Sequence, residues 1–106
     1  MPFYALDAIP PALPAPGITR RAVYLQRVML TFFDFADGAV IPQHSHPHEQ
    51  ITYIIEGALE FTLAGETRLL RAGEGVAVPA DAPHSAIARG PCKVLDGWSP
   101  IREDYT

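Results

Sequence analysis

Cysteine is nearly absent from this chain: Cys92 is the single one among 106 residues, so no intramolecular disulfide can form. It lies close to Val94 and Leu95, where a buried, inert thiol is expected rather than a reactive one. A fold without disulfides suits a cytoplasmic location. At this length one hydrophobic core can form without covalent staples, and we expect a single globular domain.

Basic residues and long apolar runs are also scarce. The chain has 8 lysines and arginines against 12 aspartates and glutamates, for a net charge of −4, which argues against a nucleic-acid-binding surface. The N-terminus has no basic start followed by an apolar run, and prolines stand at positions 2, 10, 11, 14 and 16. We therefore expect no signal peptide. Nor is any apolar stretch long enough to span a membrane.

Long helical patterns are missing as well, and short strand patterns take their place. Runs of β-branched and aromatic residues are separated by glycine and proline turns. The predicted strands cover residues 22–27, 29–35, 50–56, 58–63, 66–71, 76–78, 85–89 and 93–98. Closely spaced short strands predict an all-β sandwich or barrel, here over residues 18–106.

Residues 1–17 form a proline-rich N-terminal arm that is too restricted for a regular helix. The arm still carries apolar side chains, which predict that it packs either on its own barrel or on a neighbouring subunit. These are Phe3, Tyr4, Leu6, Ile9 and Leu13.

Two histidines, His44 and His46, stand one residue apart. Successive strand residues point to opposite faces, so in an extended segment both imidazoles point to the same side. Two convergent imidazoles can hold a divalent metal once further ligands join them. The alternative is a pair of ordinary surface histidines beside a proline turn. Imidazole suits Zn, Ni, Mn, Fe and Co alike, so the ligands do not select the metal.

Two motifs in register resemble those of the cupins, a family of small jelly-roll β-barrels. The first is matched by Gly38, His44, His46, Gln50 and Gly57, with glutamine in place of the usual glutamate. The second is matched by Gly73, Pro79 and His84, with Asp81 in place of a glycine and Ala88 in place of an asparagine. The resemblance implies an all-β cupin jelly roll that holds one divalent transition metal through His44, His46, Gln50 and His84.

The fourth ligand is assigned to Gln50 rather than to its neighbour Glu49, although a carboxylate has the stronger ligand chemistry. Gln50 has the six-residue spacing to Gly57, and strand alternation places Gln50 with Thr52 on one face and Glu49 on the other. A neutral amide oxygen leaves the metal its full double charge and makes it a stronger Lewis acid. For His48, a place in a loop or in hydrogen bonding to a ligand is expected.

A closer resemblance is to the KdgF-type cupins of pectin degradation. It rests on the run HSHPHEQ at 44–50, the run YIIEG at 53–57, and the C-terminal stretch from Leu95 to Tyr105. It implies a metal-dependent isomerase that opens and ketonises 4,5-unsaturated uronate monosaccharides released from pectin or alginate. It also implies a homodimer, in which the 1–17 arm could be an exchanged or docked edge strand. The alternatives are an Fe(II) dioxygenase and a non-catalytic cupin that binds a small molecule.

Three further residues are candidates for the substrate site. Asp96 shares one strand face with Trp98, and the resemblance implies that this aspartate is the general acid or base near the metal. The alternative is an Asp-Gly turn that ends the strand, with the tryptophan as rim packing. Trp98 could stack on a sugar or line the cavity. Arg27 is the candidate partner for a uronate carboxylate, because it lies within the apolar run from Ala22 to Phe35.

Overall fold

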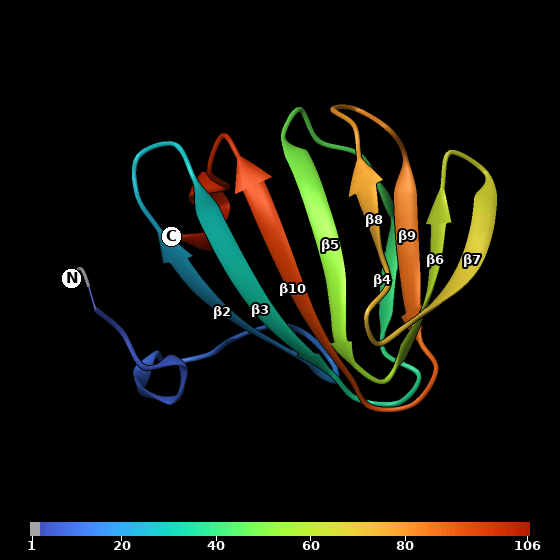
Figure 1. Cartoon of the computed structure of the whole chain (residues 1–106), viewed down its shortest axis with the longest axis horizontal. Coiled ribbons are helices and arrows are strands. Elements are labelled where there is room, and N and C mark those ends of the chain that lie inside the picture. Colours follow the sequence, from blue (N-terminus) through green and yellow to red (C-terminus); the bar gives the residue numbers. More distant parts are fainter. Residues whose placement is uncertain (1–2) are drawn as a thin grey trace.

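The computed structural model describes residues 3–106 as an almost entirely β fold (Figure 1). Short 3₁₀ turns lie near both ends, η1 (Leu6–Ala8) and η2 (Glu103–Tyr105). The strands are β1 (Ala12–Ala15), β2 (Ile18–Tyr24), β3 (Met29–Phe35), β4 (Val40–His44), β5 (Glu49–Glu56), β6 (Ala58–Leu63), β7 (Glu66–Arg71), β8 (Gly75–Val78), β9 (His84–Ala88) and β10 (Cys92–Ser99). In the described part of the chain, no helix is long and apolar enough to cross a membrane.

The strands form two antiparallel sheets that face each other as a jelly roll. One sheet has the order β1-β2-β3-β10-β5-β8 and the other the order β4-β9-β6-β7. Figure 1 shows the C-terminal strand β10 inserted between β3 and β5, in the middle of the larger sheet. The prediction of an all-β jelly roll is confirmed.

Most predicted strands agree with the observed ones, but two strands were not predicted and one was misplaced. The pattern over 22–27 belongs to a strand that begins at Ile18 and ends at Tyr24. The unpredicted strands are β1, within the proline-rich arm, and β4, which leads into the first histidine. Because β1 is an edge strand, proline can occupy it without removing a ladder hydrogen bond. It pairs with β2 of the same chain, so residues 12–15 of the arm lie on their own barrel.

On the inner face of the larger sheet, buried residues of three neighbouring strands change from apolar to polar at the same position along the strands. Alternation buries every second residue of β3, β5 and β10. The register then aligns these residues in two neighbouring rows, with Phe33, Val94 and Ile54 in one and Thr31, Asp96 and Thr52 in the next. The first row belongs to the hydrophobic core. Thr52 and Asp96 of the second row line a cavity that His44 and His84 also line.

Gly57, the glycine that closes the first motif, stands between β5 and β6 at a φ of +85°. A Cβ atom built there would lie 2.2 Å from the Pro91 carbonyl oxygen. Glycine is therefore required by both the backbone conformation and the close approach of the neighbouring chain. The tight turn carries the chain from the larger sheet to the smaller one.

Candidate metal centre and cavity

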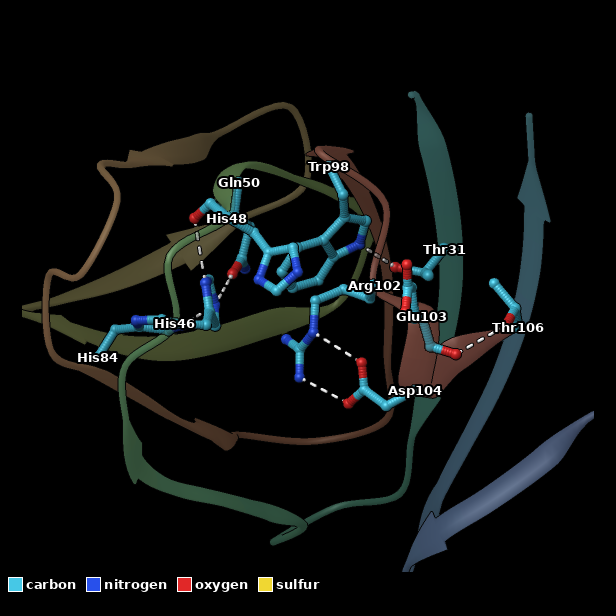
Figure 2. A network of polar contacts seen from close by, with 10 residues as sticks. All are labelled: Thr31, His46, His48, Gln50, His84, Trp98, Arg102, Glu103, Asp104 and Thr106. Atoms are coloured by element: carbon cyan, nitrogen blue, oxygen red, sulfur yellow. Dashed lines mark hydrogen bonds and ion pairs between the residues drawn. The ribbon is translucent and has the colours of Figure 1, made fainter. Parts of the chain in front are cut away.

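Four sequence-predicted ligands converge in one cluster, and Figure 2 shows three of them, His46, Gln50 and His84. His44 ends β4, His46 lies in the following loop, and His84 begins β9. One ring nitrogen from each of these histidines lies within 4.8 Å of the others. The amide of Gln50, from β5, joins them with its Oε1 atom 3.1 Å from His46 Nε2. Segments up to 40 residues apart in the chain thus supply one cluster.

A β-bulge turns His44 toward the cluster. Ile41 pairs with Ala86 and His44 pairs with His84, so β4 spends three residue steps where β9 spends two. The extra residue reverses the side-chain alternation of β4. As a result, the rings of His44 and His84 approach each other with centroids 4.3 Å apart. The two histidines of the H-x-H pair do converge as predicted, although His46 already lies beyond the end of the strand.

Backbone carbonyls determine which ring nitrogen of each histidine carries the proton. The Nδ1 atoms lie 2.9, 3.1 and 2.8 Å from the carbonyl oxygens of Pro42, His48 and Ala82. A carbonyl oxygen can only accept a hydrogen bond, so each Nδ1 must donate and each Nε2 keeps its lone pair. Burial lowers the pKa of His46 and of His84 below its ordinary value, which favours the neutral rings that metals require.

The resulting set of acceptors fits a divalent cation. His46 Nε2 lies 3.2 Å from His84 Nε2 and 3.1 Å from the Gln50 oxygen. Three lone pairs that face one another at such distances repel unless a cation lies between them. Nitrogen and amide oxygen are ligands that borderline transition metals accept. The donor set therefore fits the metal predicted from the sequence.

Strand alternation separates Gln50 from Glu49 as predicted. Gln50 is 6% exposed and faces the cavity, whereas Glu49 is exposed on the outer face of β5. The amide nitrogen of Gln50 donates to Thr52 Oγ1 at 2.9 Å. One end of the amide thus faces the histidines, and the other is held by its own strand.

Asp96 also faces the cavity, in the middle of β10 rather than in an Asp-Gly turn. It is 5% exposed, and its Oδ1 atom accepts a 2.5 Å hydrogen bond from Thr52 Oγ1 and a longer one, 3.4 Å, from the Gln50 amide. Burial raises the pKa of Asp96 to about 6, although both hydrogen bonds lower it. A carboxyl that titrates near neutrality can both accept and return a proton.

Trp98 lines the cavity next to Asp96 along the same strand face. Its indole nitrogen donates to Thr31 Oγ1 at 2.9 Å, which fixes the ring. The ring stands edge-on to His46 with centroids 5.2 Å apart, and edge-on to Tyr105 at 5.7 Å. The tryptophan therefore lies between the histidine cluster and the C-terminal turn.

Arg27, the predicted partner of a uronate carboxylate, lies between β2 and β3. The apolar run in which it lies contains a turn from 25 to 28, and Arg27 is exposed there and is not among the residues that line the cavity. Two other arginines lie at the cavity end instead. Arg20 of β2 lines the cavity, with its guanidinium carbon 3.8 Å from the centre of the Tyr105 ring.

Arg102 is the functional candidate that sequence reasoning missed. Its guanidinium carbon lies 5.0 Å from the centre of the Trp98 ring and 4.3 Å from that of Tyr105. Figure 2 shows the side chain between Trp98 and Asp104, which binds two of its nitrogens at 3.1 and 2.9 Å. The third nitrogen, Nη1, is buried and has no hydrogen-bond partner within residues 3–106. The run Arg102-Glu-Asp-Tyr at the end of the chain was the available signal, but nothing local indicates that it folds over the cavity.

The cupin-domain family model matches residues 31–98, which contain every ligand of the cluster. The chain belongs to the cupin family. This cupin is also 32% identical to the pectin degradation protein KdgF of Dickeya dadantii (strain 3937) over 92 residues, which are 84% of each chain. Its fold is similar to that of KdgF from Halomonas sp., with 34% identity, a TM-score of 0.93, and coverage of 98% of this chain and 97% of the other. An RmlC-like cupin from Shewanella frigidimarina NCIMB 400 has a TM-score of 0.96 at 26% identity and covers 100% and 96% of the two chains.

The cavity of this cupin thus brings three kinds of chemistry together. A three-histidine cluster that could hold a metal ion lies at one side. A buried carboxyl with a raised pKa lies beside it, and Trp98, which also lines the cavity, belongs to an aromatic and cationic cluster with Tyr105, Arg20 and Arg102. Such a cavity can polarise an oxygen, move a proton and hold an anionic group on one small ligand.

Proposed function

We propose that this cupin is a metal-dependent isomerase that opens and ketonises 4,5-unsaturated uronate monosaccharides in the degradation of pectin or alginate. The observation that carries the proposal is the position of Asp96, buried in the same cavity as the histidine cluster and linked to the candidate ligand Gln50 by a 3.4 Å hydrogen bond. The similarity to pectin degradation protein KdgF supports the substrate class.

The proposed reaction rearranges bonds without adding or removing atoms. Opening the ring breaks the bond between the anomeric carbon and the ring oxygen while the proton of the anomeric hydroxyl moves to the ring oxygen, which leaves an aldehyde and an enol. The enol becomes a ketone when its neighbouring carbon, C4, accepts a proton and its hydroxyl releases one. No electron acceptor and no second substrate are needed.

The residues of the cavity can be given roles in this rearrangement. His44, His46, Gln50 and His84 would hold the divalent ion, which would supply Lewis-acid stabilisation of negative charge on a substrate oxygen. Asp96 would move the proton between oxygen and C4, because its raised pKa suits it to both directions of transfer.

The buried, unpaired Nη1 of Arg102 offers a hydrogen bond to the uronate carboxylate. Asp104 holds the other two guanidinium nitrogens and fixes their direction. Trp98 lies beside the guanidinium and offers its ring face or edge to the sugar.

The test is an incubation with 4,5-unsaturated galacturonate, followed by NMR, of the metal-loaded wild type beside Asp96→Asn, His46→Ala and a protein-free blank. We expect rapid conversion to the linear ketone by the wild type only. Conversion at the rate of the blank in all samples would refute the isomerase. Oxygen consumption on turnover with Fe(II) would identify a dioxygenase instead, and a ligand that binds but is recovered unchanged would identify a binding protein.

We also propose that the cupin is a homodimer in which the N-terminal arm contacts the second copy. Although β1 pairs within its own chain, Phe3 remains 91% exposed and Leu13 75% exposed. Exposed apolar side chains on a short edge strand and in the segment before it are suited to contact a second copy of the same surface. Removal of residues 1–14 should convert the dimer to a monomer in light scattering, and an unchanged mass would refute the role of the arm.

A further inference from the structure

We propose that Thr52 is a positioning residue that fixes which end of the Gln50 amide faces the metal ligands. One acceptor–acceptor contact and two hydrogen bonds in sequence carry this inference. Gln50 Oε1 lies 3.1 Å from His46 Nε2, Gln50 Nε2 lies 2.9 Å from Thr52 Oγ1, and Thr52 Oγ1 lies 2.5 Å from Asp96 Oδ1. The inference rests on the proposed metal centre and concerns how this chain prepares one of its ligands.

The direction of the hydrogen bonds follows from what each group can donate. An ionised carboxylate only accepts, so the Thr52 hydroxyl gives its hydrogen to Asp96. The hydroxyl oxygen is then left to accept, and only the amide nitrogen of Gln50 can donate to it. The carbonyl oxygen of the amide must therefore point the other way, toward His46.

Without this constraint the opposite orientation would be favoured in the absence of metal. The Nε2 atoms of His46 and His84 carry lone pairs, because their Nδ1 atoms donate to backbone carbonyls. A rotated amide would donate its N–H groups to these lone pairs. An amide nitrogen has no lone pair to offer a metal, so the rotated side chain would block the site rather than complete it. The Thr52 hydroxyl, which accepts the shorter of the two hydrogen bonds from the amide nitrogen, opposes this rotation together with the Asp96 carboxylate, which accepts the longer one at 3.4 Å.

The register of the sheet explains why Thr52 can do this. Thr52 pairs with Asp96 across β5 and β10, and Gln50 follows two residues away on the same face of β5. Thr52 is 3% exposed, so water does not replace its hydroxyl as a partner. The arrangement matters for glutamine in particular, because a glutamate in the same place would present two equivalent oxygens and need no orientation.

Valine has nearly the shape of threonine, so Thr52→Val removes the hydroxyl and leaves the packing in place. Binding of Co(II) is measured by competition with a chelator at neutral pH or above. We expect Thr52→Val to weaken binding by about 10- to 100-fold, the usual effect of removing a group that orients a ligand. The visible spectrum of bound Co(II) should also change, since a ligand is lost. Thr52→Ser, which keeps the hydroxyl, should restore both properties.

Thr31→Val is the matched control. Thr31 is 0% exposed, lies in the same row as Asp96, and accepts a hydrogen bond from the Trp98 indole, but it does not contact Gln50. This variant should bind Co(II) as the wild type does. A second test places Thr52→Val in a Gln50→Glu background, where we expect no further loss of affinity.

The orientation can also be observed in the unmodified protein, even if the valine variant does not fold. In NMR spectra of the protein with a diamagnetic Zn ion, the side-chain NH₂ protons of Gln50 should show cross-relaxation with Thr52 and not with the ring of His46. Cross-relaxation with His46, or equal Co(II) affinity of Thr52→Val and wild type, would overturn the inference alone. A wild type that binds no metal would overturn the proposed function together with it.

Discussion

The substitution Asp96→Asn should stabilise the metal-free protein at alkaline pH, even though it is expected to abolish the reaction. Burial raises the pKa of Asp96 from 3.8 to about 6, so the folded chain holds this proton more tightly than the unfolded chain. The stability that the protonated carboxyl contributes is complete below the unfolded pKa and is lost as the pH rises through the folded pKa. Above that range the folded protein contains a buried negative charge.

The magnitude follows from the two pKa values. The difference between 3.8 and about 6 corresponds to about 3 kcal/mol, since each pKa unit is worth about 1.36 kcal/mol. Asparagine keeps the shape and can still accept hydrogen bonds from Thr52 and Gln50 without carrying the charge. The variant should therefore gain up to about 3 kcal/mol at pH 8, and most of this gain should vanish near pH 4.

Urea unfolding in the presence of a chelator measures this difference, with the fluorescence of Trp98, the single tryptophan, as the probe. The control is Asp34→Asn, because the Asp34 carboxylate is half-exposed and paired with Lys93 at 3.0 Å. This control should not gain stability at any pH. The reasoning would be refuted if Asp96→Asn were no more stable than wild type at pH 8, or if its gain were the same at both pH values.

Three further predictions concern the metal, the anion and the fold. Addition of Zn²⁺ to protein from which metal has been removed with a chelator should raise the melting temperature of the wild type, measured by calorimetry, but not that of His84→Ala. Equal shifts of the two melting temperatures would argue against the proposed ligand set. Arg102→Ala should raise KM for an unsaturated uronate much more than Arg27→Ala does in steady-state kinetics. The reason is that the Arg102 guanidinium lies beside Trp98, whereas Arg27 is exposed in a turn. Equal KM values for the two variants would argue that Arg102 is not part of the substrate site. Gly57→Ala should destabilise the fold by at least about 2 kcal/mol in urea unfolding, because the new Cβ would lie 2.2 Å from the Pro91 carbonyl oxygen and the backbone φ is positive. A stability close to that of the wild type would contradict this turn geometry.

Side-chain alternation was readable from the sequence wherever a strand is regular. It placed Gln50 and Thr52 on one face of β5, and Asp96 and Trp98 on one face of β10, as the structure has them. The resemblance to cupins, carried by the spacing of His44, His46 and His84, identified the cluster that the structure brings together. Side-chain alternation depends on each strand alone, and motif spacing is read directly from the sequence, so both could be used without knowledge of the fold.

Alternation could not locate features that depend on where a strand bends or ends. The bulge that turns His44 inward is an irregularity of one residue in β4, and the two-residue alternation of a regular strand does not predict it. Likewise, the run containing Arg27 has strand composition throughout, but the chain turns there in order to pair β2 with β3. The predicted substrate arginine was therefore placed on the outside of the molecule.

The sequence by itself determined the β class of this protein, the inward-facing residues of its regular strands and its set of candidate metal ligands. Only the tertiary structure decided which residues become partners across long separations. Thr52 lies beside Asp96 because β10 enters the sheet next to β5, and Arg102 lies over Trp98 because the C-terminal turn folds back on the cavity. The physical reason is that alternation is set by each residue's own backbone, whereas sheet order and register depend on the packing of the whole chain.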